Sequence, residues 1–338
     1  MTEEEHDINF ALNIILEENK KLNNTVNELK QSNAQLTSDF NEYKKNTDKI
    51  LDGYYENFNR LFLMYEITPK GALKGTHVMC QELLDFVVNI CNKYDLQYWL
   101  DFGNLLGCIR HNGFIPWDDD IDIGMMRKDF NVFLKVIKKE ISDNGLEDLI
   151  RVTIDKKYRY KDRESIIPFM QIAYFTDRSH LLAGLDIFIY DYVKEEIEDM
   201  DKIFYAEKQK YHKVMLTETN REKALQPYYE KMGVCLEEED YIIPAIENVR
   251  SKYSYKFMVY DKNDFFPLEK LSFNDASYYC PKNYDSYLKT IYGDYHNIPK
   301  SLGKHQRVYN LMKDKHVEEL FDTHIKKLQD VNMTYKSR

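Results

Sequence analysis

The side chains best suited to metal chemistry lie in the run WDDDIDIG, residues 117–124, which places four carboxylates within five residues. Ile121 and Ile123 alternate with Asp120 and Asp122. This period of two predicts a β-strand with both carboxylates on one face, their Cα atoms about 6.6 Å apart. Carboxylate oxygens suit Mg²⁺ or Mn²⁺ and leave coordination positions for phosphate oxygens. We therefore predict a divalent-metal site at Asp120 and Asp122.

A calcium loop is one alternative, because Asp118, Asp120 and Asp122 have the spacing of the first three EF-hand ligands. The sixth position would be Ile123, where the loop needs glycine, and the twelfth would be Asp129 instead of glutamate. The sequence therefore excludes the EF-hand. A solvated acidic turn is the remaining alternative.

A glycine-bracketed turn, Gly103 to Gly107, precedes the acidic strand and leads into a short helix. Such a turn lets backbone N–H groups approach a phosphate. Arg110 and His111 follow it, and the fork of donors on arginine fits a diphosphate. The alternatives are a surface arginine and an ordinary turn histidine.

A third carboxylate is expected from Asp186 in the apolar segment GLDIFI, residues 184–189. An unpaired carboxylate on a buried strand is costly, so a metal or a proton-transfer role would account for it. A structural salt bridge is the alternative. Asp191 lies an odd number of residues away, so we expect it to face elsewhere.

Residues 1–51 contain neither proline nor glycine and show an unbroken 3-4 apolar repeat. Leu22, Leu29 and Leu36 fall at heptad position d, and Asn19 and Asn33 at position a. This pattern predicts a coiled-coil helix that forms a parallel homodimer. A long helix folded back on its own domain is the alternative. We expect a hinge at 52–75, with a break at Gly53 and a helix end before Pro69.

From residue 76 onwards, short strands and helices alternate irregularly, which predicts an α+β catalytic domain spanning 76–330. A helix from a Thr76 N-cap to Lys93 comes first. The other expected segments are strands at 98–100, 120–123, 169–175 and 185–192, and helices at 128–140, 194–232 and 281–338. These segments predict a mixed sheet flanked by helices.

The composition narrows the class of protein further. A net charge of −10 and a pI near 5.5 argue against nucleic acid as a partner. Five cysteines without CxxC spacing indicate reduced thiols. The acidic N-terminus is unlike a secretory signal, and no apolar run reaches the ~18 residues of a membrane span. We expect a cytoplasmic protein, at most peripheral at the inner face of the membrane. The basic stretch 300–338 could face an anionic membrane or a lipid-linked glycan, but a solvated helical face is the preferred interpretation.

Three segments together resemble the LicD family, which includes bacterial phosphocholine transferases and is similar to fukutin and fukutin-related protein. Residues 98–124, YWLDFGNLLGCIRHNGFIPWDDDIDIG, resemble the family signature. Residues 184–193 resemble its second motif, and residues 283–299 its C-terminal motif, which His305 follows. The coiled coil lies outside the resemblance.

The resemblance implies a nucleotidyltransferase-like fold and transfer of a phospho-alcohol, typically phosphocholine, from a CDP-alcohol donor. The acceptor would be a hydroxyl of a surface glycan, as in lipopolysaccharide, teichoic acid or capsule biosynthesis, or its lipid-linked precursor. Alternatives are a nucleotidyltransferase that releases pyrophosphate and a degenerate, non-catalytic coiled-coil scaffold.

Carried over by position, Asp120, Asp122 and Asp186 would hold Mg²⁺ or Mn²⁺ and serve catalysis. The donor phosphates would meet Gly103, Asn104, Gly107, Arg110, His111 and His305. Asn104 stands where the family usually has threonine, and its amide can also donate to phosphate. If the alcohol is choline, its ammonium needs aromatic faces, and Trp99, Phe114 and Trp117 are the candidates. A place in the hydrophobic core is the alternative for each of them.

Overall fold

The structure is a computed structural model that describes residues 3–65, 67–160, 163–176, 180–248, 257–298, 311 and 316–337. The chain divides into two compact units, Met1–Glu66 and Ile67–Arg338. Each unit is described by itself below.

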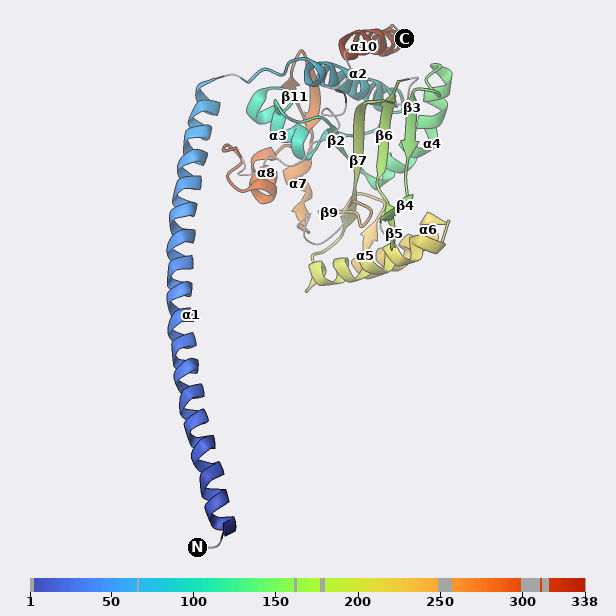
Figure 1. Cartoon of the computed structure of the whole chain (residues 1–338). Helices are drawn as coiled ribbons and strands as arrows, with labels where there is room; N and C mark the ends of the chain where they lie inside the picture. Colours follow the sequence, from blue (N-terminus) through green and yellow to red (C-terminus); the bar gives the residue numbers. More distant parts are fainter. Residues whose placement is uncertain are drawn as a thin grey trace. The chain divides into compact units, whose positions relative to one another are not determined.

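The first unit is one helix, α1, spanning Glu3–Met64 (Figure 1). It passes through Gly53 without interruption, so the break expected there is absent. The helix ends before Pro69, as predicted. Its d-position side chains Leu22, Leu29 and Leu36 are exposed. The coiled-coil dimer remains a prediction.

The second unit is built on a mixed sheet in which β2 (Ile121–Met126) lies parallel to β7 (Leu181–Val193). The strand order is β1-β2-β7-β6-β3, with β1 (Trp99–Leu100), β6 (Met170–Phe175) and β3 (Ile150–Thr153) in antiparallel pairs. Both β8 (Val234–Cys235) and β9 (Tyr241–Pro244) pair with the far end of β7, and β10 (Tyr260–Asp261) pairs with β9. The sheet is mixed, as predicted, and β2–β7 is its parallel pair among the described strands.

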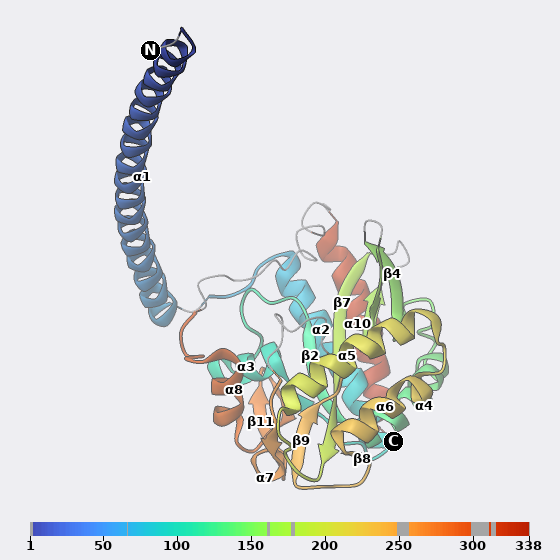
Figure 2. The ribbon, with the colours of Figure 1, turned by 90° about the horizontal axis from the view of Figure 1, so that it is seen from below.

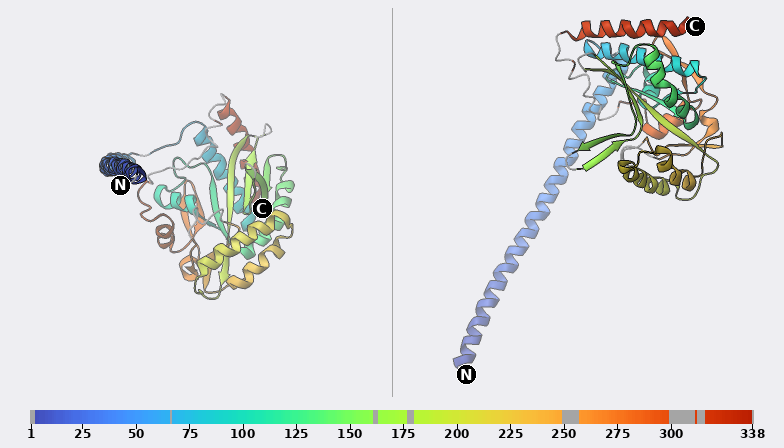
Figure 3. Two further views of the ribbon diagram at one scale, coloured as in Figure 1. Left: turned by 60° about the horizontal axis from the view of Figure 1, so that its bottom comes forward. Right: turned by 90° about the vertical axis from the view of Figure 1, so that its right-hand side faces the viewer.

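Helices flank this sheet. Figure 2 shows α5 (Met200–Thr217) and α6 (Arg221–Met232) towards the viewer, with α2 (Ala72–Lys93) and α10 (Val317–Lys336) behind. The right-hand view of Figure 3 shows α10 lying along α2. The remaining helices are α3 (Phe102–His111), α4 (Arg127–Asp143), α7 (Lys262–Phe265) and α8 (Tyr284–Tyr292).

Two separate hairpins complete the unit: β4 (Lys156–Tyr160) with β5 (Arg163–Ile167), and β11 (Glu269–Phe273) with β12 (Ala276–Cys280). The sequence did not predict either hairpin. It also misplaced the start of α2, which begins at Ala72 after Gly71. Gly71 has φ of 57°, a left-handed conformation that favours glycine. Thr76 therefore lies inside the helix and is not its N-cap.

Among the described helices, none is both long and apolar enough to span a bilayer.

Candidate active site

The centre of the site is the parallel pair β2–β7, which places Asp122 directly beside Asp186. In-register residues of neighbouring strands share a face, so both carboxylates lie on the same side of the sheet. Ile121 and Ile123 are fully buried on the other side. The Gln171 side chain of β6 donates to Asp186 at 3.0 Å. The structure thus brings together two carboxylates that are 64 residues apart in the sequence.

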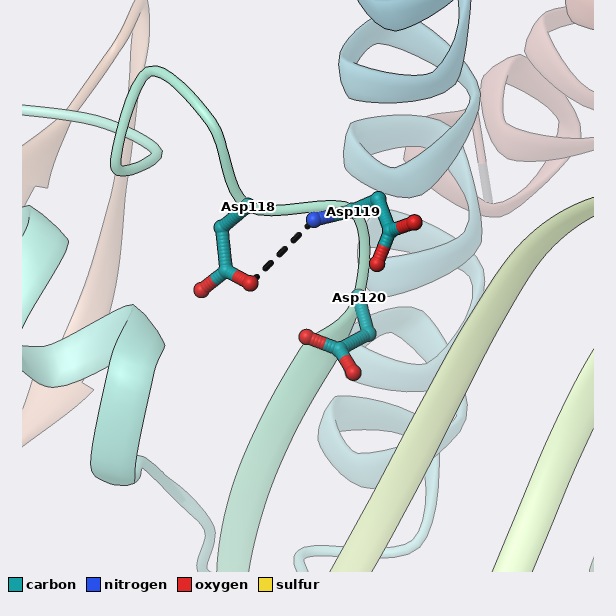
Figure 4. Close-up of side chains that lie close together, drawn as sticks. All are labelled: Asp118, Asp119 and Asp120. Carbon is teal, nitrogen blue, oxygen red and sulfur yellow. Dashed lines mark hydrogen bonds between the residues drawn. The ribbon is translucent and has the colours of Figure 1, made fainter. Parts of the chain in front are cut away.

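The loop before β2 supplies more carboxylates (Figure 4). One ligand atom from each of Asp118, Asp119 and Asp120 lies within 4.8 Å of the others. Strand β2 begins at Ile121, so Asp120 precedes the strand and the predicted start at 120 is one residue early. The predicted metal site contains Asp120 and Asp122 alone, whereas the loop's conformation also brings Asp118 and Asp119 into the cluster.

The first turn of α3 packs against these carboxylates. A Cβ at Gly103 would lie 2.8 Å from Oδ2 of Asp118 and 3.9 Å from Oδ2 of Asp122. Both side chains therefore approach the same point, and a side chain at position 103 would push the Asp118 carboxylate aside. The predicted glycine turn is thus the start of the helix itself, where N–H groups lack partners within the helix. Gly107 has a different use: its missing Cβ admits the backbone of Gly113.

The negative charge of this cluster affects the pKa of Asp122. Burial, followed by the charges of Asp120 and Asp186, raises the pKa of Asp122 well above its ordinary value. Asp118 and Asp101 add to the effect. Gathered carboxylates of this kind are the hard oxygen donors that Mg²⁺ and Mn²⁺ prefer, and a bound cation would offset their repulsion. The side chains present therefore fit a divalent metal.

A buried hydrogen-bond network joins the three motifs that carry the family resemblance. Asp101, in the first motif, accepts hydrogen bonds from the hydroxyls of Tyr190 and Tyr287, which belong to the second and C-terminal motifs. The backbone N–H of Asp101 donates to the carbonyl of Asp122 at 3.0 Å. Burial raises the pKa of Asp101 to about 6, although the two tyrosines oppose that shift. Sequence reasoning missed this network, because only the fold brings the three motifs together.

Asn104, predicted to meet phosphate, is buried and accepts a hydrogen bond from the backbone N–H of Asp122 through Oδ1. It thereby ties α3 to the acidic strand. The side-chain oxygen of Asn104 therefore positions Asp122. The sequence alone does not predict this role.

Arg110 and His111 lie at the other end of α3. Arg110 donates from Nη1 to the carbonyls of Tyr295 and Asn297, and from Nε to His111. Burial and the charge of Arg110 lower the pKa of His111 to about 4, so the imidazole is neutral at pH 7. Both contacts to carbonyl groups fall within the C-terminal motif, so Arg110 holds that motif against α3.

The three aromatic candidates lie in three different places. Trp99 is fully buried against Tyr190 and Phe265 and over Gly124, so it is a core residue and its predicted alcohol-binding role is wrong. Phe114 stacks on the His77 ring at 4.8 Å. Trp117 is half-buried beside Arg110 and His111. His305 lies outside the described residues.

Comparison with known proteins confirms the family resemblance. Residues 95–213 match the sequence model of the LicD/FKTN/FKRP nucleotidyltransferase domain. The chain is 32% identical over 151 residues to the lipopolysaccharide cholinephosphotransferase LicD of Haemophilus influenzae, covering 44% of this chain. It is 41% identical over 62 residues to the ribitol 5-phosphate transferase FKRP of Homo sapiens, covering 18% of this chain. Residues 95–213 of the second unit are therefore similar to the nucleotidyltransferase domain of that family.

The matched segments cover 53% of the Haemophilus influenzae protein and 12% of the human one. The chain thus spans about half the length of its bacterial relative. Both relatives are, by name, transferases of a phosphate-linked alcohol.

Proposed function

We propose that this protein is a metal-dependent transferase with a nucleotidyltransferase-like fold. It moves a phospho-alcohol, with phosphocholine as the expected group, from a CDP-alcohol to a glycan hydroxyl. The carrying observation is the alignment of Asp122 with Asp186 beside Asp118 and Asp120, at the first turn of α3. The named activities of the two relatives support the same reaction class.

The proposed reaction is an in-line displacement. The acceptor oxygen attacks the β-phosphorus of the donor, a new P–O ester forms, and the bond from that phosphorus to the bridging oxygen breaks to release CMP. Such a reaction depends mainly on positioning and charge neutralisation. Bound Mg²⁺ or Mn²⁺ would supply that neutralisation at the phosphate oxygens.

The chain's own residues have distinct tasks in this proposal. Asp120, Asp122 and Asp186 would hold the metal, and Asp118 joins them as a fourth carboxylate. Gly103 leaves room for the Asp118 and Asp122 carboxylates, and its own amide in the first turn of α3 can face a donor phosphate. Asp186 accepts the proton of the attacking hydroxyl. Arg110 positions the C-terminal motif against α3.

The test is CMP release from a panel of CDP-alcohols with Mg²⁺, using the purified full-length protein. We expect CMP from at least one donor, and Asp120→Asn to lower the rate about 10²–10³-fold, the usual cost of one preorganised electrostatic contact. The Asp122→Asn and double variants should be little worse, because residues acting as a unit are not additive. Asp129→Asn, on α4 outside the cluster, is the control.

Two outcomes would contradict the proposal. Full turnover in excess EDTA would show that the reaction needs no metal. Near-normal kinetics for Asp120→Asn would show that Asp120 does not belong to the active site. Pyrophosphate release from a nucleoside triphosphate would favour a nucleotidyltransferase, and the absence of any turnover a non-catalytic scaffold. The acceptor would be a glycan or a lipid-linked glycan, met in the cytoplasm or at the inner membrane face.

We also propose that α1 forms a parallel homodimer through residues 8–50. Its exposed d-position leucines need a matching apolar partner, and two a-position asparagines fix the register. Replacing Leu22 and Leu29 with aspartate in the full chain should give a monomer in sedimentation experiments and leave CMP release unchanged. The proposal fails if the unmodified chain is already monomeric at micromolar concentration.

A further inference from the structure

A polar cavity of about 590 Å³ lies between α2, α10 and the turn that joins β11 to β12. Its volume is typical of pockets for small organic ligands, which run from about 300 to 1,000 Å³. None of the catalytic roles proposed above uses it. It is lined from α2 by His77, Gln81 and Glu82, and from α10 by Gln329 and Asn332.

The polar groups of this cavity are held in place by one another. Glu82 accepts from the side-chain amides of Gln329 at 2.8 Å and Asn332 at 2.9 Å. Across the cavity, Asn274 donates to the Gln81 oxygen at 2.9 Å. Since these side chains are already fixed by hydrogen bonds, ligand binding would cost little side-chain conformational entropy. The cavity therefore offers a preformed array of carboxylate and amide groups.

The charges of the lining indicate which chemistry it accepts. Three carboxylates, Glu82, Asp85 and Asp275, outnumber the two lysines Lys74 and Lys336. An anionic ligand such as a nucleotide is disfavoured here. Carboxylate and amide oxygens instead accept hydrogen bonds from neutral hydroxyl groups.

Two rings add an apolar part to the lining. His77 and Phe114 both border the cavity, and their rings stack on each other at 4.8 Å. A sugar ring carries hydroxyl groups at its rim and C–H groups on its faces, so it presents both polar and apolar surface. A polyhydroxylated neutral ring is thus the ligand that matches this mixed lining.

The cavity adjoins the acidic loop. His77 lines the cavity, and its Nε2 lies 2.8 Å from the carbonyl oxygen of Asp118. Phe114 and Asp118 belong to the same loop. The His77 side chain therefore links the cavity lining to the backbone of the loop that carries the carboxylates.

We propose that this cavity is a subsite for a neutral sugar ring of the acceptor glycan. This proposal rests on the transferase function proposed above in one respect: that function identifies the bound sugar as part of the acceptor. It assigns hydroxyl recognition to Glu82, Asp275 and Gln329, residues of α2, α10 and the β11–β12 turn.

Saturation-transfer NMR on the full-length protein tests it with three probes: methyl β-D-glucopyranoside, methyl β-D-galactopyranoside and the methyl glycoside of N-acetylglucosamine. We expect at least one to bind, with Kd of millimolar order, and the double variant Asp275→Ala/Gln329→Ala to weaken it about tenfold through lost hydrogen bonds. Asp330→Ala is the matched control, an exposed acid on α10 outside the lining.

The proposal is overturned if no glycoside shows saturation transfer, or if the double variant binds as well as the unmodified protein. It is also overturned if CMP competes with the bound glycoside, because the cavity would then be a nucleotide site. An unchanged thermal midpoint verifies that the double variant is folded. If the midpoint is lowered, the single variant Asp275→Ala, at an exposed residue of the lining, repeats the measurement with Asp330→Ala as its control. Glycoside binding and CMP release are separate readouts, so either proposal can fail without the other.

Discussion

Strand β7 carries two carboxylates, Asp186 and Asp191, in opposite electrostatic surroundings. Asp191 is fully buried, and both Arg127 and Tyr228 donate to it. Asp186 lies beside Asp122, whose pKa is raised by the carboxylates around it. One face of the strand therefore has its charge balanced by the chain's own arginine, whereas the other gathers carboxylates that a metal could balance.

The balanced region extends beyond Asp191. Arg127 also donates to both oxygens of Glu247, at 2.8 and 2.9 Å, and Arg221 bridges Glu247 to Asp155. Burial alone would raise the pKa of Glu247, but the charges of Arg127 and Arg221 lower it to about 2. These contacts connect α4, α6 and β7. This network is a structural one, because the chain's own arginines balance the charges of its buried acids.

The largest effect should come from breaking the balanced network. Arg127→Ala leaves Asp191 and Glu247 buried with a lost partner, and removal of one member of a buried ion pair costs about 3–5 kcal/mol. Chemical denaturation should show that loss. Lys128→Ala is the control: it removes a salt bridge to Glu237 in which both side chains are exposed, and the midpoint should barely move.

Chemical denaturation of Asp122→Asn sharpens the comparison, because its change in the free energy of unfolding should have the opposite sign to that of Arg127→Ala. Without metal, replacing Asp122 relieves repulsion, so stability should be kept or increased. Added Mg²⁺ should stabilise the unmodified protein and not the variant. If Arg127→Ala is as stable as the original chain, or Asp122→Asn unfolds, the two regions have been assigned the wrong way round.

Asp101 is an intermediate case, a buried carboxylate with tyrosine hydroxyls as its side-chain donors. Its pKa in the folded protein is about 6, against an ordinary value of 3.8. The folded state therefore binds the proton more tightly, so this stabilisation is present below about pH 4 and is lost as the pH rises to about 6. The shift corresponds to about 3 kcal/mol.

Denaturation from pH 4 to 7 checks this prediction. Asp101→Asn should flatten the decline in stability across that interval. Tyr287→Phe removes a donor that favours the ionised carboxylate, so it should extend the decline to higher pH. An identical pH profile for Asp101→Asn and the unmodified protein would show that Asp101 does not titrate there.

Much of the site could be predicted from sequence because its signals are local. The alternation at Asp120–Ile123 predicts a strand and the side of the sheet on which its carboxylates lie. The apolar neighbours of Asp186 predict the second strand. The pairing of Asp122 with Asp186 depends on which strands lie side by side, and no local pattern encodes that.

The errors also have physical causes. Trp99 lies within the signature motif but packs over Gly124 in the core, because proximity in sequence does not place a ring at a pocket. Thr76 was read as a cap because threonine favours that position, whereas Gly71 sets the helix start through its positive φ. Asp118 lies in a loop, and a loop has no regular repeat from which the direction of its side chains can be predicted.

The smallest effect concerns Asn104, where sequence and structure assign different tasks. If Asn104 positions β2, Asn104→Ala leaves the buried N–H of Asp122 without its acceptor, at a cost of about 1–3 kcal/mol. CMP release should then slow with the KM for the CDP-alcohol little changed, because the donor's own contacts remain. Asn104→Thr retains a side-chain oxygen and should recover part of the stability. If instead Asn104 serves as a phosphate ligand, Asn104→Ala would raise that KM and leave the free energy of unfolding unchanged, and the assignment made from the structure would be wrong.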